Sequence, residues 1–345
     1  MTSTLPVAPW RLFTVEVRAV RRLSPSFVRV TFTGPDLDRF ADNGYDQRIK
    51  LALPLPGQRL VHLPQGPDWY ARWRALPEQQ RNPIRTYTAR AVRPQLNEVD
   101  VDLVLHGDGG PATRWARRVR PGDEIAILGP DSAYDGDHGG VEFRPPSTGC
   151  LLLAGDETAV PAISNICARL PFDAQGRVLL EVPEAADVLP LVAPPGVRVT
   201  WLPRGADPYG ARLVAAVAAA AGELLASAAP ALAGASAAGM VPALAGAAAA
   251  GAPTGQLLDD VDVDREILWE VPEAQPTAPL YAWLAGEASV IRTLRRHLVA
   301  DRNLDRYRGV EGVAEDSALP FNQGVGAELI AQRWRLSRTQ LDEFA

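Results

Sequence analysis

The sequence is poor in the residue types that build metal centres and disulfide frameworks. Its 345 residues include 2 cysteines, Cys150 and Cys167, and 4 histidines that lie far apart. The cysteines have neither the number nor the spacing of a disulfide scaffold or a zinc site, and no histidine falls in a metal-binding motif. We therefore expect no protein-bound metal ion, and we interpret both cysteines as buried thiols.

A basic surface and a leader segment are also missing. The chain has 35 Lys and Arg residues against 41 Asp and Glu residues, which gives a net charge of −6. This balance argues against a nucleic-acid partner, because binding to phosphates depends on clustered cations. Residues 1–10 contain no basic run followed by an apolar stretch, so we expect a cytoplasmic protein.

One Ala-rich segment, 211–253, superficially resembles a membrane span. Glu223, Pro230 and Pro242 interrupt it, and alanine contributes little to transfer into lipid. We interpret the segment as an insertion that does not enter a membrane. Alanine has the best helix propensity, so the insertion should be partly helical, with breaks at the prolines.

The chain divides into two halves with different hydrophobic patterns. Up to about residue 130, short runs such as 27–33 alternate apolar and polar residues, which is typical of antiparallel strands with one buried face. After Pro145 and Pro146, continuous apolar runs such as 150–154 alternate with helical patterns, as in a parallel, doubly wound sheet. The sequence therefore predicts an antiparallel β domain over 1–146, a barrel or a sandwich, and an α/β domain over 147–310.

Two strand-to-helix turns in the second half have similar sequences. Leu153 to Asp156 and Leu284 to Glu287 each close a buried strand and open a helix. Ligands of open α/β sheets sit beyond the carboxyl ends of the strands, so we expect both turns to line one crevice.

A polar, aromatic and cationic cluster occupies one strand of the first half, at Arg85, Thr86, Tyr87 and Thr88. A flavin dinucleotide needs a flat wall for its ring, a hydrogen-bond donor near N5 and a cation for its pyrophosphate. Tyr87, Thr88 and Arg85 offer these three groups from neighbouring positions. An exposed strand face with no ligand would have the same composition, so this segment is a weak motif on its own.

A glycine-rich turn follows the next strand of this half. Glycines let backbone amides approach a phosphate, and Pro111 suits the first turn of a helix whose unpaired N–H groups attract anions. We interpret the turn as a pyrophosphate cradle, and the alternative is a tight turn before a helix. Its candidate residues are His106, Gly107, Asp108, Gly110, Pro111, Ala112 and Thr113.

Together with 153–163 and 283–288, these two motifs resemble the siderophore-interacting protein family, over about residues 11–308. Members are FAD-dependent ferric-siderophore reductases with a ferredoxin-reductase-like build. The resemblance implies an FAD-binding β-barrel and a nicotinamide-nucleotide-binding α/β domain. It implies that Arg85 to Thr88 hold the flavin, with Thr88 near N5, and that the cradle holds the rest of FAD.

The same resemblance places the nicotinamide nucleotide against the first turn of the α/β half, at Gly155, Asp156, Glu157 and Thr158. Gly286 and Glu287 belong to the second turn of the crevice. The first turn lacks a full GxGxxG fingerprint. Asp156 and Glu157 can also be interpreted as caps that complement a helix dipole.

The activity implied is reduction of ferric siderophores by NADPH or NADH through FAD, with release of Fe(II). No general base or nucleophile is needed, and the sequence has no catalytic triad. Lys50, which is the only lysine, and Arg48 are candidates for the anionic substrate, although both could be solvated cations of a strand edge. Arg204 could meet the 2′-phosphate of NADP. Arg292, Arg295 and Arg296 fit a charged outer helix face better than a substrate site.

The last residues depart from the family pattern. The tail over 311–345 predicts two helices, the second opening at a capping box from Ser337 to Gln340, and its last ~25 residues resemble an internal stretch of thiolases. Two alternatives therefore stay open. One is another flavin reductase or electron-transfer module of this build, and the other is a non-catalytic flavoprotein that binds iron chelates. The siderophore, the nucleotide and the oligomeric state are not specified by the sequence.

Overall fold

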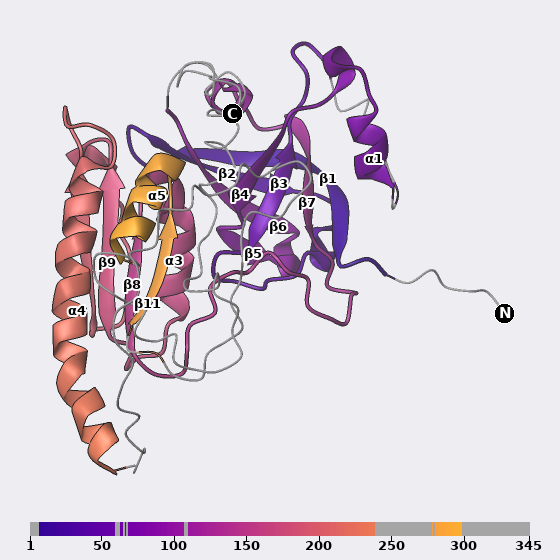
Figure 1. Ribbon diagram of the computed structural model, residues 1–345. Helices are drawn as coiled ribbons and strands as arrows, with labels where there is room; N and C mark the ends of the chain where they lie inside the picture. Colours follow the sequence, from indigo (N-terminus) through magenta and orange to yellow (C-terminus); the bar gives the residue numbers. More distant parts are fainter. Residues whose placement is uncertain are drawn as a thin grey trace.

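The structure is a computed structural model that describes residues 7–58, 63–64, 66, 68–106, 110–238, 278 and 280–298, with side chains to 227 in the long Ala-rich helix. Two halves lie side by side in it (Figure 1), a β half and an α/β half. The predicted tail over 311–345, Gly107 and Asp108 lie outside the described residues.

The β half is a curled antiparallel sheet of seven strands in the order β4-β3-β7-β1-β2-β6-β5. Alternate side chains of these strands point inward, where Phe13, Val30, Ile49 and Ile127 are buried in one core. Strands β4 and β6 contact each other, so the sheet curls into a barrel-like shape. The strands are β1 (Trp10–Arg22), β2 (Phe27–Thr33), β3 (Arg48–Ala52), β4 (Ile84–Thr88), β5 (Ala91–Arg93), β6 (Glu98–Val104) and β7 (Glu124–Pro130).

Short helices connect several of these strands. They are η1 (Leu37–Arg39), α1 (Trp69–Arg74), η2 (Glu78–Gln80), η3 (Pro94–Leu96) and α2 (Pro111–Ala116). Helix α2 begins at a proline, as the sequence predicts, because proline needs no intrahelical N–H partner there.

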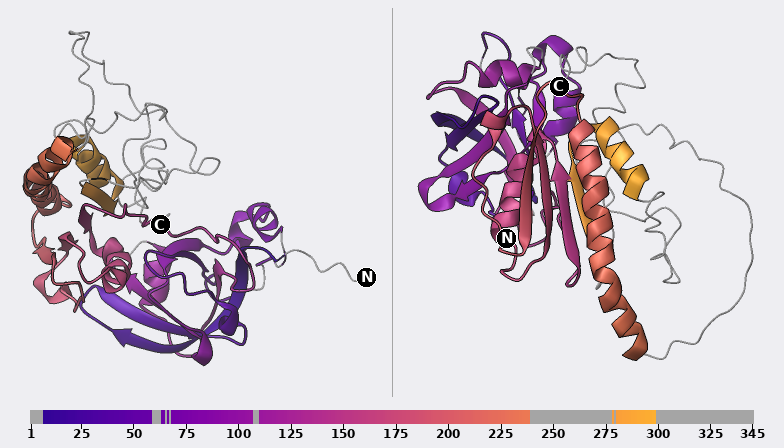
Figure 2. Two further views of the ribbon diagram at one scale, coloured as in Figure 1. Left: turned by 90° about the horizontal axis from the view of Figure 1, so that it is seen from below. Right: turned by 90° about the vertical axis from the view of Figure 1, so that its left-hand side faces the viewer.

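The α/β half is a parallel sheet in the order β10-β9-β8-β11 with helices on both faces, which confirms the predicted fold class. Helix α3 covers the face toward the barrel, and α4 and α5 cover the other face (Figures 1 and 2). Its elements are β8 (Cys150–Gly155), η4 (Glu157–Ala159), α3 (Val160–Arg169), β9 (Gly176–Val182), η5 (Ala185–Asp187), β10 (Val197–Pro203), α4 (Ala211–Ala238), β11 (Leu280–Ala285) and α5 (Ala288–Arg296).

The Ala-rich segment begins as helix α4. Its Leu213, Val217 and Leu224 belong to the core against the sheet, so the first part of this segment is integral to the α/β layer. The helix runs through Pro230, where the sequence predicts a break. A proline inside a helix removes one hydrogen bond but can be accommodated with a bend. Among the described residues, none of the helices combines the length and the apolar character needed to span a membrane.

The two halves share a tightly packed boundary. Phe27 and Val104 of the barrel belong to the same core as Leu153 and Val178 of the parallel sheet. The fully buried Asp187 accepts hydrogen bonds from the Ser24 and Ser26 hydroxyls at 2.7 and 2.9 Å. Because burial of such polar groups is favourable only when they are paired, these bonds fix how the halves sit together.

Candidate functional site

A cavity of about 220 Å³ lies at the junction of the two halves. The barrel side is built by β4 and β6, and the α/β side by η4, the start of α3 and the end of β11. Its lining residues are Arg85, Thr86, Tyr87, Thr88, Asp102, Val104, His106, Thr158, Ala159, Pro161, Ala162, Trp283, Ala285 and Gly286.

Strand β4 brings all four predicted flavin residues to this cavity. Tyr87 packs against the barrel core, and burial raises its pKa to about 12, so the phenol is neutral at physiological pH. Thr88 is buried and is one of the residues that line the cavity. Burial lowers the pKa of Arg85, but its guanidinium keeps its charge, and one of its N–H groups donates to the Ile84 carbonyl at 2.8 Å. A ring wall, a hydroxyl and a cation thus follow one another on a single strand.

The predicted cradle is only partly described. His106 lines the cavity, and Gly110 immediately precedes the first residue of α2, Pro111. Ala112 and Thr113 are 5% and 4% exposed, and Ala112 belongs to the barrel core. Neither residue is part of the cavity lining, so the backbone of this turn is the part that we expect to meet a phosphate.

The two similar turns of the α/β half meet at the cavity, as the sequence predicts. The buried carboxylate of Asp156 accepts hydrogen bonds from the Thr158 amide at 2.8 Å, the Tyr209 hydroxyl at 2.8 Å and the Glu287 amide at 2.7 Å. Gly286 adopts φ +149°, and a Cβ there would lie 2.6 Å from an Asp156 carboxylate oxygen. Asp156 is thus a cap that joins both turns.

Glu287 also acts as a cap. Its carboxylate accepts a hydrogen bond from the Val290 amide at 3.1 Å, at the start of α5. Arg292, Arg295 and Arg296 lie on this helix, whose buried side is formed by Val290, Ile291 and Leu294, in keeping with a charged outer face.

A buried ion-pair network occupies the carboxyl ends of β8, β9 and β10. The Arg204 guanidinium lies 3.2 Å from the Glu157 carboxylate and 3.1 Å from the Glu181 carboxylate, and 4.1 Å from the centre of the Tyr209 ring. Glu157 is 2% exposed, and burial, together with the charge of Asp156, raises its pKa. Arg204 is therefore paired with two buried carboxylates, and its contact with the 2′-phosphate of NADP stays a prediction.

The proposed substrate cations lie on β3, beside the flavin strand. Arg48 and Lys50 share the face opposite to the buried Ile49, and Lys50 stands in register with Thr86 of β4. Arg48 lies 3.4 Å from Glu142 and its side chain is 13% exposed, so it is a paired cation and not a solvated one. Burial, and then the charge of Arg48, lowers the pKa of Lys50. Neither residue is part of the cavity lining.

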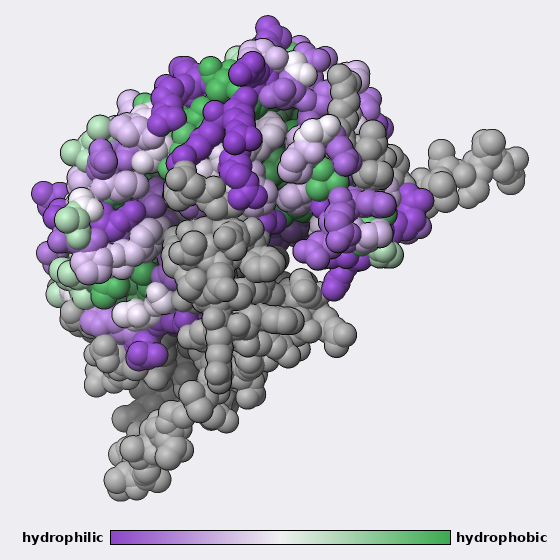
Figure 3. Space-filling model, turned by 90° about the horizontal axis from the view of Figure 1, so that it is seen from above, coloured by the Kyte–Doolittle hydropathy of each residue, from purple (hydrophilic) through white to green (hydrophobic). Residues whose placement is uncertain are grey.

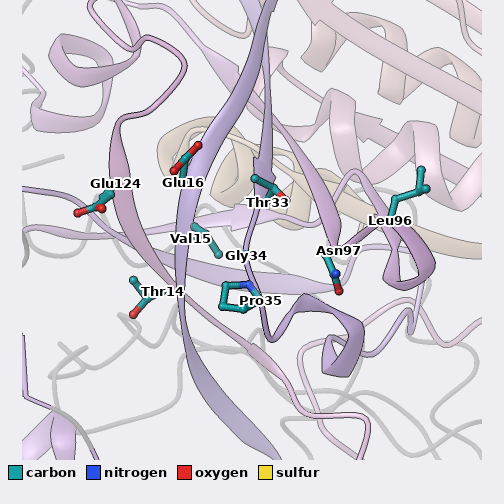
Figure 4. A pocket seen from close by; sticks show the side chains of 9 residues that line it. All are labelled: Thr14, Val15, Glu16, Thr33, Gly34, Pro35, Leu96, Asn97 and Glu124. Carbon is teal, nitrogen blue, oxygen red and sulfur yellow. The ribbon is translucent and has the colours of Figure 1, made fainter.

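A second hollow of about 450 Å³ lies on the outer wall of the barrel (Figure 4). Glu16 of β1 and Glu124 of β7, which face each other in register, contribute carboxylates to it, and Leu96 closes one side. Its lining contains neither an aromatic ring nor a cation. Although it is larger, this hollow lacks the groups that a flavin dinucleotide needs, and the junction cavity is the better candidate.

Sequence reasoning missed three polar residues near the cavity. Asp102 lines it and binds the Arg29 guanidinium with bonds of 2.6 and 2.7 Å. Asn165 of α3 bonds to the chain just after β4, and the buried Asp46 accepts a hydrogen bond from the Trp283 ring N–H at 3.2 Å. The alternation of aspartates with valines in β6 was a usable signal, since carboxylates in a covered strand need cationic partners.

Comparison with known proteins identifies the chain. Residues 16–134 match a family model described as a siderophore-interacting FAD-binding domain, and residues 149–309 match one described as siderophore-interacting protein. Ferric vibriobactin reductase ViuB of Vibrio cholerae is 35% identical over 196 residues, which cover 57% of this chain and 67% of that protein. The chain belongs to the siderophore-interacting protein family.

Further matches agree with this family. The crystal structure of the siderophore-interacting protein SipS from Aeromonas hydrophila superposes with a TM-score of 0.57 at 27% identity, covering 94% of this chain and 96% of that one. An NADPH-dependent ferric-chelate reductase of Escherichia coli is 29% identical over 201 residues, 57% of this chain and 73% of that protein. Mycobacterial relatives, 38% identical, are matched over 66% of their length, just under two thirds.

These matches confirm the predicted family and its FAD-binding domain. Individual cofactor-binding residues stay predictions of the motif and the geometry.

Proposed function

We propose that this siderophore-interacting protein is an NAD(P)H-dependent reductase of ferric siderophores. The observation that carries the proposal is the junction cavity. One wall of it holds an arginine, a tyrosine and a threonine on a single strand, and the other wall consists of two linked turns of an α/β sheet. The names of the Vibrio and Escherichia relatives support ferric chelates as the substrate class and NADPH as an electron donor.

The barrel wall fits FAD. Tyr87 would face the flavin ring, the Thr88 hydroxyl would donate near its reactive edge, and Arg85 would bind the pyrophosphate. A half-buried guanidinium attracts a phosphate more strongly than an exposed one, because less water screens it. The backbone from Gly110 to Thr113 would bind the remaining phosphate oxygens.

The α/β wall fits the nicotinamide nucleotide in a different way. Thr158, Ala159, Ala285 and Gly286 have small side chains, which leave room for a flat ring against the flavin. The chemistry supplied by bound FAD would be the conversion of a two-electron donor into a one-electron donor, so that one NAD(P)H and two Fe(III) ions would yield NAD(P)⁺, two Fe(II) ions and one proton. The protein would hold and orient the flavin, the nucleotide and the ferric chelate. We propose that Lys50 attracts the anionic chelate, because it is in register with Thr86, which lines the cavity.

An anaerobic titration tests this function. The purified yellow protein should lose its flavin absorbance on addition of NADPH or NADH and regain it on addition of a ferric siderophore, faster than with buffer. Bleaching without recovery by ferric chelates would favour another flavin reductase of this build. A flavin that neither nucleotide bleaches would favour a non-catalytic flavoprotein. A cytoplasmic location stays a prediction of the sequence.

A further inference from the structure

The side chain of Asn165 joins the two halves at the end of the flavin strand. Asn165 lies on α3 and is 6% exposed. Its amide nitrogen donates to the Ala89 carbonyl oxygen at 2.8 Å, and its amide oxygen accepts from the Arg90 guanidinium at 2.9 Å. Both partners directly follow Thr88, the last residue of β4. A buried amide with both ends paired has one orientation, so this contact fixes the chain on either side of it.

This contact lies beside the cavity. Pro161 and Ala162 precede Asn165 by four and three positions, which places all three on the same side of α3. Pro161 and Ala162 line the cavity from the α/β half, and Thr88 lines it from the barrel. The Asn165 bonds therefore cross the junction next to the place where the two walls face each other.

On the barrel side, Arg90 is held by its own partner. Its guanidinium lies 3.5 Å from the Asp102 carboxylate, which also binds Arg29 at 2.6 Å and lines the cavity. Burial lowers the pKa of Arg90, with Asp102 opposing that effect. The Arg90 guanidinium is thus anchored to Asp102 in the barrel, and the Asn165 amide oxygen is its neutral acceptor in the α/β half.

Another contact between the halves lies away from the cavity. Asp187 accepts from the Ser26 amide at 2.7 Å and from the Ser26 hydroxyl at 2.9 Å, and neither residue is part of the cavity lining. Loss of the Asn165 bonds should therefore leave the halves joined while it frees the end of β4.

We propose that Asn165 is a positioning residue that sets the distance between the flavin and nicotinamide sites. This inference rests on the proposed function. Hydride transfer needs reacting atoms about 3–3.5 Å apart, and a misplacement of about 1 Å can cost ~100-fold in rate. The flavin site belongs to β4, and the nicotinamide site belongs to the turns that lead into α3. The distance between them therefore depends on the contact between Ala89 and α3, which the Asn165 side chain makes.

The test compares Asn165→Leu, which removes both bonds, with Asn165→Asp, which keeps an acceptor for Arg90, and with Ser26→Ala as the matched control at the distant contact. Asn165→Leu should slow single-turnover flavin bleaching at saturating nucleotide by roughly 10- to 100-fold, with FAD affinity unchanged within about twofold. Asn165→Asp should recover part of that rate, and Ser26→Ala should react like the parent protein.

Hydrogen exchange of residues 84–93 in FAD-free protein provides a readout that needs no activity. Asn165→Leu should raise exchange in this segment, and Ser26→Ala should not. Three results would each overturn the proposal. The first is equal exchange in all proteins, and the second is a bleaching rate for Asn165→Leu equal to that of Ser26→Ala. The third is a fall in the FAD affinity of Asn165→Leu as large as the fall in its bleaching rate. Failure of the parent protein to bleach would instead refute the proposed function, and the exchange comparison would still decide whether Asn165 fixes β4.

Discussion

The two walls of the cavity use charged residues in opposite ways. On the barrel wall, Arg85 and Tyr87 line the cavity from one strand. On the α/β wall, the charged residues of the matching motif are turned toward one another, with Asp156 bonded to both turns and Glu157 paired with Arg204. The barrel wall thus includes charged side chains, whereas the residues that line the cavity from the α/β half are uncharged, from Gly286 and Ala159 to Trp283.

This difference fits the proposed function. A flavin that stays bound would need specific side-chain contacts, which the barrel wall can offer. A nucleotide that comes and goes would need an open, firmly shaped turn, and the buried network can give the turn that shape. The face of the molecule shown in Figure 3 is mostly hydrophilic, with smaller apolar patches between the hydrophilic residues. The charged residues of a motif can therefore shape a turn through their contacts with one another.

The largest expected effect comes from breaking the α/β network. Arg204→Met would leave the buried Glu157 and Glu181 without their cation, which should cost about 3–5 kcal/mol of unfolding free energy. Urea denaturation measures this loss. The exposed pair of Arg177 and Glu223 is the matched control, and Arg177→Met should cost less than about 1 kcal/mol.

The same variant separates the two roles of Arg204. Its preference between NADPH and NADH, measured on the fraction that remains folded, should match that of the parent protein. If the Arg204→Met protein were fully stable and had lost only its affinity for NADPH, Arg204 would be a ligand of the 2′-phosphate.

The next effect concerns the barrel wall. Arg85→Ala combined with Tyr87→Ala removes a charge-assisted contact and an aromatic contact, so FAD affinity should fall roughly 100-fold or more. Quenching of flavin fluorescence measures the affinity, and circular dichroism checks the fold. Arg11→Ala removes a surface cation that pairs with Asp36 and should leave the affinity unchanged. Normal FAD retention by the double variant would contradict the assignment of β4.

Features set by local pattern were predictable from the sequence. The continuous apolar run at 280–285 became β11, with all six residues buried, and the alternation at 27–33 became β2 of the barrel. The candidate flavin residues Arg85, Tyr87 and Thr88 were predictable because they lie within one strand, so residues that are near in the sequence are also near in space. Local periodicity carries this information because it reflects the burial of one face.

The partners of charged residues were not predictable in this way. Arg204 and Glu181 are 23 positions apart, and Asn165 and Ala89 are 76 apart. A sequence states that a cation is present, but only the packing of distant elements decides whether a carboxylate lies against it. The sequence predicts an insertion at the segment that forms helix α4, although the first part of this helix packs on the sheet. Its many alanines give little sign of which helix face is buried.

A smaller effect tests how closely the two turns must meet. Gly286→Ala would place a methyl group against the Asp156 carboxylate at a positive φ, which should cost about 1–3 kcal/mol of unfolding free energy. Gly205 is the matched control, because it also has a positive φ, +59°, but nothing lies within 4 Å of the position that a Cβ would take there. Gly205→Ala should therefore show the backbone strain alone, a loss of about 1 kcal/mol of unfolding free energy. Equal costs for both variants would mean that the turns can separate without penalty.

The smallest effect is a pH dependence on the barrel wall. Burial raises the pKa of Tyr87 from 10.0 to about 12, so above pH 10 the unfolded chain loses this proton before the folded protein does. The stability that the neutral phenol contributes is therefore complete below pH 10 and is lost as the pH rises toward 12. In urea denaturation of FAD-free protein, the unfolding free energy of the parent protein should decrease by about 1 kcal/mol relative to that of Tyr87→Phe as the pH rises from 9 to 11. A difference that stays constant over this range would mean that the Tyr87 phenol is open to water in the FAD-free protein.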